Sequence, residues 1–188
     1  MKSAKIFLIM LAMPLLIGCA AFGILNAIVP TGGMEPTIMV DSRIVGDTRA
    51  FNDSLPERFD IVMFYGESGN LYVSRIIGLT GETLLIREWR VYVNGSDTPL
   101  RDDFTMAYES ELKQHRNFPV PPSNEEEIPS FITVPEDGST PYITIPEDSY
   151  FMLGDHRNNS VDSRSWLNPF IHSDDIAAKV IRISIPVQ

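Results

Sequence analysis

The chain has 188 residues, a length that suits one folded domain with a small appendage. Its hydrophobic content of 44% is sufficient for a core and excludes global disorder. A formal net charge of −10, with no basic patch or stripe in the sequence, argues against nucleic acid as a partner.

An apolar segment without formal charge occupies residues 6–29. As a helix, these 24 residues would extend about 36 Å, enough to cross a hydrocarbon core of about 30 Å. Lys2 and Lys5 precede the segment, and strongly acidic sequence follows it. The positive-inside rule therefore predicts a cytoplasmic tail over residues 1–5, a single transmembrane anchor over 6–29 and an extracytoplasmic domain over 30–188.

Cys19, the only cysteine, offers a second interpretation of this segment. Residues 16–19 (Leu-Ile-Gly-Cys) follow two lysines and an apolar run, and so resemble a lipoprotein signal with a lipid-accepting cysteine. Cleavage as an ordinary secretory signal is the third interpretation. We favour the uncleaved anchor, because the apolar run continues for ten residues past Cys19. All three place the domain on the outer side of a membrane.

The sequence beyond this segment is typical of a mainly β domain, because short apolar or β-branched runs are bounded by Gly, Asn, Asp or Pro. The Asn94-Gly95 dipeptide predicts a turn, a signal that is strongest when strands flank it, as they do here. Residues 94–150 include the least regular sequence and are predicted to form a variable insertion or cap. The predicted strands are residues 61–65, 71–73, 83–86, 91–93 and 176–185.

Three segments carry a resemblance to a known family. They are residues 30–37 (Pro-Thr-Gly-Gly-Met-Glu-Pro-Thr), 72–82 (Tyr-Val-Ser-Arg-Ile-Ile-Gly-Leu-Thr-Gly-Glu) and 154–164 (Gly-Asp-His-Arg-Asn-Asn-Ser-Val-Asp-Ser-Arg). Together with residues 58–64 and 175–180, they resemble the boxes of type I signal peptidases, in the family's order. The resemblance implies a mainly β, signal-peptidase-like fold of several antiparallel sheets with an N-terminal transmembrane helix.

The resemblance also implies two reacting groups, a serine nucleophile and a lysine general base. The serine belongs where Gly33 stands, and the lysine belongs where Ser74 stands. Gly33 has no side chain, and the hydroxyl of Ser74 is far too weak a base to replace an amine. The sequence therefore predicts a member of the family that lacks both dyad residues, similar to the non-catalytic relatives in pilus assembly. Two simultaneous losses, one of them to glycine, fit natural change better than engineering.

Other positions match supporting residues of the family. By resemblance, Thr31 is the hydroxyl donor of the oxyanion hole, and Ser160 is the serine that hydrogen-bonds the catalytic lysine. Asp162 and Arg164 match a supporting ion pair, whereas Asp155 and Arg157 match a structural turn. The remaining structural box residues are Met34, Pro36 and Arg75.

Histidines offer the one rewired alternative, in which Ser74 would be the nucleophile and His156 its base. The spacing gives this alternative no support. His115 and His172 are predicted to be solvated or capping residues, and Trp166 and Phe170 to fill the core. We expect no metal and no cofactor.

The sequence thus predicts a membrane protein that binds secreted precursors or pilin-type polypeptides without cleaving them, in pilus assembly or a chaperone-like role. Its expected partners are the lipid bilayer and these polypeptides. The alternative is an active type I signal peptidase that removes signal peptides with non-standard residues.

Overall fold

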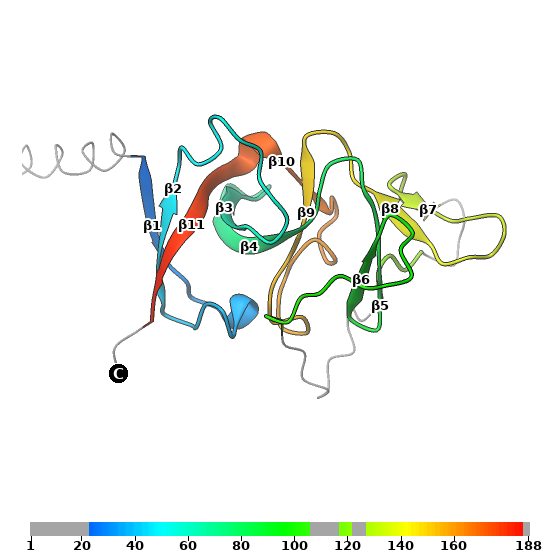
Figure 1. The fold of residues 1–188 in the computed structure, drawn as a ribbon, viewed down its shortest axis with the longest axis horizontal. Helices are drawn as coiled ribbons and strands as arrows, with labels where there is room; N and C mark the ends of the chain where they lie inside the picture. Colours follow the sequence, from blue (N-terminus) through cyan, green and yellow to red (C-terminus); the bar gives the residue numbers. More distant parts are fainter. Residues whose placement is uncertain (1–22, 106–116, 122–126, 186–188) are drawn as a thin grey trace, which may run out of the picture.

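The computed structural model describes residues 23–105, 117–121 and 127–185. Their largest element is a seven-stranded antiparallel sheet in the order β1-β2-β11-β3-β4-β9-β10 (Figure 1). The chain enters and leaves this sheet repeatedly. As a result, β1 and β11, the first and last strands along the chain, are separated in the sheet only by β2. The strands are β1 (Ile24–Ile28), β2 (Arg43–Asp47), β3 (Ile61–Tyr65), β4 (Leu71–Gly78), β9 (Ser149–Leu153), β10 (Phe170–His172) and β11 (Ile176–Ser184).

A second, four-stranded antiparallel sheet lies beside the first, toward the right in Figure 1. Its order is β6-β5-β8-β7, from β5 (Thr83–Arg87), β6 (Arg90–Val93), β7 (Ile132–Thr133) and β8 (Tyr142–Thr144). The variable insertion or cap predicted over about residues 94–150 stays a prediction. The β5–β6 hairpin belongs to the same sheet as β8, whereas β9 belongs to the large sheet.

The structure corrects the carboxyl-terminal end of the predicted anchor. Ile24–Ile28 is not helical but forms β1, which pairs with β2 from Ile24↔Asp47 to Ile28↔Arg43. Its backbone groups are satisfied by the neighbouring strand, which excludes a helix over the same residues. The rest of the predicted anchor, with Cys19, and the predicted tail lie outside the described residues.

Across the described ranges, the structure contains no helix with the length and apolar character needed to span a bilayer.

The predicted strands are otherwise confirmed, with small differences at their ends. Residues 61–65 form β3 as predicted, and 71–73 are the start of the longer β4. The predicted turn at Asn94-Gly95 is formed directly after β6, with a hydrogen bond from the Ser96 backbone N–H to the Val93 carbonyl oxygen at 3.1 Å. The Asn94 side chain also accepts a hydrogen bond from the Thr83 backbone N–H at 3.0 Å. The β5–β6 hairpin itself turns at Glu88 and Trp89, both at positive φ.

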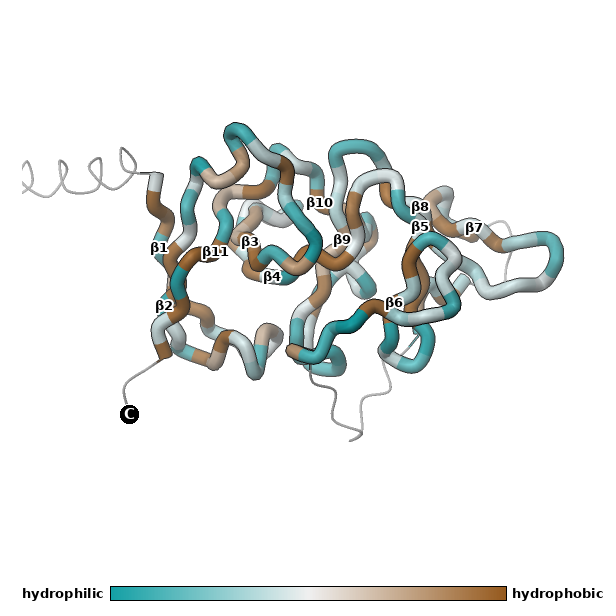
Figure 2. Tube along the Cα trace, viewed as in Figure 1, coloured by the Kyte–Doolittle hydropathy of each residue, from teal (hydrophilic) through white to brown (hydrophobic). Residues whose placement is uncertain are grey.

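Three apolar clusters hold the sheets together, and Figure 2 shows the corresponding hydrophobic stretches along the strands. One cluster joins the two sheets, and it includes Ile77, Leu84, Ile143 and Phe151. The other two lie on opposite faces of the large sheet, because alternate residues of a strand point to opposite faces. Met63 belongs to one of them and Val62 to the other.

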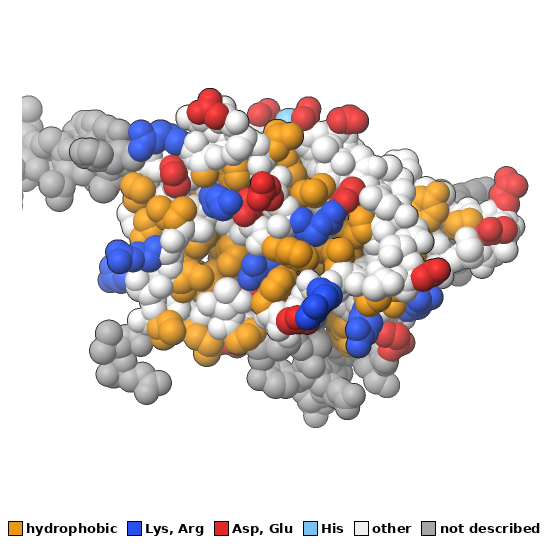
Figure 3. Space-filling view, viewed as in Figure 1, with side chains coloured by type: hydrophobic (Ala, Val, Ile, Leu, Met, Phe, Trp, Pro, Cys, Tyr) orange, Lys and Arg blue, Asp and Glu red, His pale blue; other side chains and the backbone are white. Residues whose placement is uncertain are grey.

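On the face shown in Figure 3, Lys and Arg side chains are interspersed with Asp, Glu and apolar side chains. A continuous basic stripe of the kind that tracks a phosphate backbone is not formed by the described residues on this face. The expectation that nucleic acid is no partner stays a prediction.

Candidate functional site

The turn that contains Gly33 is fixed by its apolar neighbour. Gly32–Met34 forms one 3₁₀ turn, η1, shortly after β1. Met34 is only 2% exposed and packs with Val29, Ile38 and Met63. Thr31 precedes the turn in extended conformation, is exposed, and makes no capping hydrogen bond with its side chain. The predicted oxyanion donor is therefore next to Gly33 with its hydroxyl outside the turn's own hydrogen bonds.

Gly33 faces Ser160, a residue far away in the sequence. A Cβ atom on Gly33 would lie 3.4 Å from the Ser160 Cβ, which is ordinary van der Waals contact. The carbonyl oxygen of Gly33 accepts a hydrogen bond from the His156 backbone N–H at 3.1 Å. The position predicted for the nucleophile therefore has room for a small side chain, and the side chain is absent.

Gly154 makes this approach of the two loops possible. A Cβ on Gly154 would lie 2.4 Å from the Gly33 carbonyl oxygen and closer still to the Ser160 Cβ. Because the first of these atoms belongs to backbone, a side chain at this position would force the Gly33 turn and the 154–164 loop apart. Glycine is therefore required here by packing.

Ser74 lies on β4, where it pairs with Val62 of β3. Directly opposite residues in an antiparallel pair point to the same face, so Ser74 faces the cluster that contains Val62, Ile76 and Met152. Ser74 is 5% exposed, and its hydroxyl has no hydrogen-bond partner. The neighbouring pair Arg75↔Leu153 places Ser74 beside Gly154, at the end of β9.

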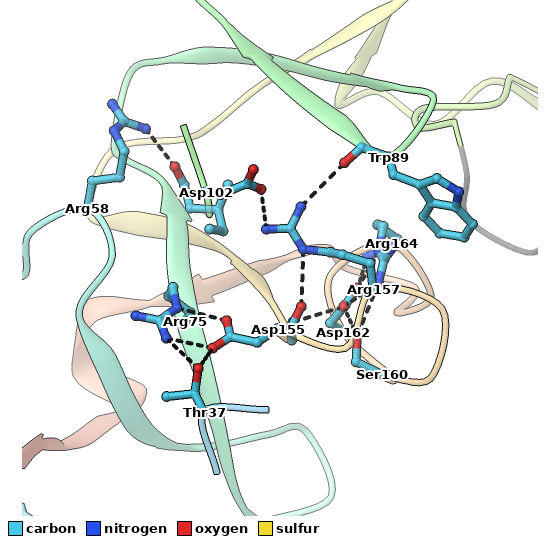
Figure 4. Close-up of polar contacts among 12 residues, drawn as sticks. Thr37, Arg58, Arg75, Trp89, Asp102, Asp155, Arg157, Ser160, Asp162 and Arg164 are labelled. Atoms are coloured by element: carbon cyan, nitrogen blue, oxygen red, sulfur yellow. Dashed lines mark hydrogen bonds and ion pairs between the residues drawn. The ribbon is translucent and has the colours of Figure 1, made fainter. Parts of the chain in front are cut away.

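Ser160, Asp162 and Arg164 form the best-connected polar group of the site (Figure 4). Arg164 binds Asp162 through Nε–Oδ1 at 2.8 Å and Nη2–Oδ2 at 2.6 Å, and both side chains are almost fully buried. The Ser160 hydroxyl donates to Asp162 Oδ2 and accepts from Arg164 Nη2 at 3.1 Å. The predicted ion pair is thus confirmed, and it orients the serine that lies against Gly33.

Asp155 and Arg157 make no pair with each other, although the sequence placed them in one structural turn. Asp155 is fully buried and accepts two hydrogen bonds from Arg75, which the sequence assigned only a structural role. Thr37 donates a further hydrogen bond to Asp155 Oδ2 at 2.5 Å. These contacts connect β4 and the 154–164 loop with the segment that follows the Gly33 turn.

Arg157 pairs instead with Asp102, with 2.7 Å between Nη2 and Oδ2. Its Nε also donates to the Gly154 carbonyl oxygen at 3.2 Å (Figure 4). Burial lowers the pKa of the Arg157 guanidinium, whereas the charge of Asp102 opposes this shift. This ion pair attaches the segment that follows β6 to the loop that carries Ser160.

His156 lies against the Gly33 turn but does not pair with Ser74. Its Nδ1 is 3.2 Å from the Gly32 carbonyl oxygen and 3.6 Å from Glu35 Oε2. Because the Ser74 hydroxyl has no hydrogen-bond partner, the serine–histidine pair of the rewired alternative is not formed. Lys179, one strand beyond Val62 in the same register, is ion-paired with Asp60 at 2.7 Å.

Two other sequence predictions have outcomes here. His172 caps η3 (Ser173–Asp175), since its Nδ1 accepts a hydrogen bond from the Asp174 backbone N–H. Phe170 is 9% exposed and belongs to the core, whereas Trp166 is only partly buried. His115 lies outside the described residues. Among the residues that are described, His, Cys, Asp and Glu form no group of three suited to a metal ion.

Four residues of the site had no assigned role in the sequence analysis. Asp102 became visible only through long-range pairing, and no local pattern marks it. Thr37 is the last residue of the recognised segment 30–37, but its pairing with Asp155 is long-range. Gly154 and Ser163 lie inside a recognised segment; Ser163 is fully buried, and its hydroxyl accepts a hydrogen bond from the Met152 backbone N–H at 2.8 Å. Hydroxyl and glycine residues in such a segment could have been singled out as candidates for backbone hydrogen bonds and close backbone approach.

Comparison with known proteins places these features in a family. The sequence profile described as "Signal peptidase, peptidase S26" matches residues 1–185. "Signal peptidase I" of Pseudomonas aeruginosa is 31% identical over 169 residues, which cover 78% of this chain and 56% of that protein. "Probable signal peptidase I-2" of Synechocystis is 28% identical and covers 82% of this chain and 61% of that protein.

The chain therefore spans somewhat more than half the length of these relatives. A crystal structure of a signal peptidase I from Enterococcus faecalis V583 aligns with 68% of this chain and 98% of that chain, at 26% identity and a TM-score of 0.44. With a profile match over nearly its whole length, the chain belongs to the S26 family of signal peptidases.

Proposed function

We propose that this protein is a non-hydrolytic member of its family, which binds extended secreted precursors or pilin-type polypeptides without cleaving them. One observation supports the proposal: Gly33 and Ser74, at the positions of the family's serine and lysine, offer neither nucleophile nor base, although the Ser160–Asp162–Arg164 group beside Gly33 is formed. Ser160 is oriented by Asp162 and Arg164, and it faces a glycine.

The loss of turnover expected without nucleophile and base is large enough to support inactivity rather than slow cleavage. Removal of the nucleophile from a serine peptidase costs on the order of 10⁶ in turnover, and loss of the base as well adds little. Ser74 offers no substitute, because a general base has to be hydrogen-bonded to the group that it deprotonates. Its hydroxyl is buried without such a partner.

Binding of a polypeptide does not need the missing groups. A sheet can take up an extended segment along an end strand, with main-chain hydrogen bonds supplying affinity. The large sheet ends in β1 and β10, and the small sheet ends in β6 and β7. In this proposal the domain acts outside the membrane, anchored by the apolar amino-terminal segment, with the bilayer as its second partner.

The test uses the full chain in proteoliposomes with a purified precursor that carries a small-x-small cleavage site, and with a purified pilin subunit. We expect both polypeptides to co-sediment with the protein and to keep their full mass. The same precursor without its signal sequence is the control for binding. Cleavage of the precursor that disappears in Ser74→Ala would establish the active-enzyme alternative. If the protein binds neither the precursor nor the pilin subunit, the proposal is overturned.

A further inference from the structure

A second feature of the large sheet lies apart from Gly33 and its supporting ion pairs. A cavity of about 630 Å³ is present where the end of β3, the β3–β4 turn, the start of β4 and the segment before β10 come together. This volume falls within the range of roughly 300–1,000 Å³ that is common for ligand pockets. We call it the aromatic pocket; its lining is Phe64, Tyr65, Gly66, Glu67, Ser68, Gly69, Tyr72, Trp166, Leu167, Asn168, Phe170, Ile171 and Asp175.

Aromatic rings dominate the lining, and they are packed in a fixed arrangement. The Phe64 ring stacks on Tyr72, with centroids 5.8 Å apart and planes at 22°. Trp166 meets the same Phe64 ring edge-on, also at 5.8 Å. Gly66 lets the Tyr72 ring lie close to the turn, since a Cβ there would be 2.7 Å from the ring. These rings are therefore preorganised and do not have to be ordered by a ligand.

The charges of the aromatic pocket have one sign. Glu67 and Asp175 contribute carboxylates, and the lining contains no Lys, Arg or His. Tyr72 is 39% exposed, so that ring surface beside these carboxylates is open to solvent. Aromatic faces attract cations, Arg guanidinium most often, and nearby carboxylates add Coulomb attraction.

The position of the pocket relates it to the proposed binding of polypeptides. Tyr72 and Ser74 alternate along β4 and so point to the same face of the sheet, about 7 Å apart. Phe170 and Ile171 also line the pocket and belong to β10, an end strand of the large sheet. An extended segment that adds along β10 can therefore place a side chain into the pocket within a few residues.

We propose that the aromatic pocket binds the cationic side chain of an arginine or lysine in the polypeptide that the domain holds. The inference rests on the proposed function for the presence of that polypeptide. It adds a preference for a basic residue, recognised by the rings of Tyr72 and Trp166 together with Glu67 and Asp175.

The test compares two fluorescent peptides that differ at one position, arginine or its neutral isostere citrulline, by anisotropy with the full chain in a non-ionic detergent. We expect the arginine peptide to bind about fivefold more tightly at low salt, with a smaller preference at high salt. Equal affinity of the two peptides would overturn the proposal.

Two variants locate the effect. Glu67→Gln with Asp175→Asn removes both charges without a change in shape, and we expect it to abolish most of the arginine preference. Glu136→Gln with Asp53→Asn removes two exposed charges from outside the pocket and corrects for net charge. If this control lowers the preference as much, the attraction is general and the pocket is not the site.

A third variant, Trp166→Leu, tests the rings, with an unfolding curve to confirm that it folds. We expect it to weaken the arginine peptide by about two- to fivefold and the citrulline peptide less. If the unaltered protein captures precursors but shows no preference for arginine, the pocket proposal alone is overturned. If it prefers arginine but captures no precursor, the proposed function alone is overturned.

Discussion

Arg75 binds Asp155 through two parallel hydrogen bonds, from Nε to Oδ1 at 2.8 Å and from Nη2 to Oδ2 at 2.6 Å. The carboxylate is fully buried, and the guanidinium carbon also lies 3.9 Å from the centroid of the Phe104 ring. The pair therefore joins β4, the loop that carries Ser160 and the segment at Thr37 through charges shielded from water.

Loss of one member of this pair is expected to destabilise the fold strongly. Arg75→Met leaves the Asp155 carboxylate buried without its cation, and such a change costs about 3–5 kcal/mol. The free energy of unfolding from denaturant titration measures it. The double variant Arg75→Met with Asp155→Leu should lose less than the sum of the two single variants. Strict additivity would show that the two side chains do not act as a pair.

The same substitution, glycine to alanine, is expected to destabilise the fold much more at Gly154 than at Gly33. Gly154→Ala places a Cβ 2.4 Å from the Gly33 carbonyl oxygen, and overpacking of this kind costs about 1–3 kcal/mol. Gly33→Ala places a Cβ at an ordinary 3.4 Å from the Ser160 Cβ, and we expect a change below about 1 kcal/mol. Thermal unfolding of both variants gives the comparison; equal losses would contradict the close approach of the two loops.

Two buried serines provide a similar contrast. The Ser74 hydroxyl has no hydrogen-bond partner, so Ser74→Ala removes a desolvated polar group and should stabilise the protein by about 1 kcal/mol. Ser163→Ala instead removes the acceptor of the Met152 N–H and should destabilise it by about 1–3 kcal/mol. Denaturant midpoints of the two variants and the wild type show whether each substitution stabilises or destabilises the fold. Destabilisation by Ser74→Ala would reveal a partner for its hydroxyl, such as an ordered water.

Alkaline pH is expected to weaken the fold through Tyr150. Burial raises the pKa of its phenol, and the charge of Asp148 adds to the rise. Above the ordinary value of about 10, the unfolded chain loses a proton that the folded chain retains, so stability falls until the higher folded pKa is passed. Unfolding curves at neutral pH and above about pH 10 should show a steeper loss for the wild type than for Tyr150→Phe. Parallel losses would mean that Tyr150 does not contribute.

The strands could be predicted from sequence, because alternation and bounding turn residues define segments such as 61–65 and 176–185. The ion pair of Asp162 and Arg164 was implied by the resemblance to type I signal peptidases, and the structure contains it. The site's long-range pairs could not be predicted. Asp102 and Arg157 are separated by more than fifty residues, and only the folded sheets bring them within 2.7 Å.

Two parts of the backbone depart from their usual sequence signals. The apolar run over residues 6–29 predicts a helix, but its last part pairs with β2 as a strand. The β5–β6 turn uses Glu88 and Trp89 at positive φ, a conformation usually taken by Asn or Gly. In both places the tertiary pairing of strands overrides the local preference.

Restoration of the two missing groups tests whether only the chemistry was lost. Gly33→Ser introduces a hydroxyl where a Cβ has ordinary contact distance, next to the oriented hydroxyl of Ser160. Ser74→Lys introduces an amine on the sheet face of Val62 and Ile76, where burial lowers its pKa and favours the neutral base. We expect the double variant to cleave a precursor at its small-x-small site, with a rate that rises with pH as this amine loses its proton.

The matched control, Gly33→Ala with Ser74→Met, fills the same space without a nucleophile or a base, and it should stay inactive. Each single substitution should also be inactive, because the two groups act as one unit and their effects do not add. Mass spectrometry of the precursor gives the cleavage position as well as the rate. A folded double variant without cleavage would mean that the site differs from a working peptidase in more than these two side chains. Thr31 would then be the first residue to examine, because it is exposed and its side chain makes no capping hydrogen bond with the turn that carries Gly33.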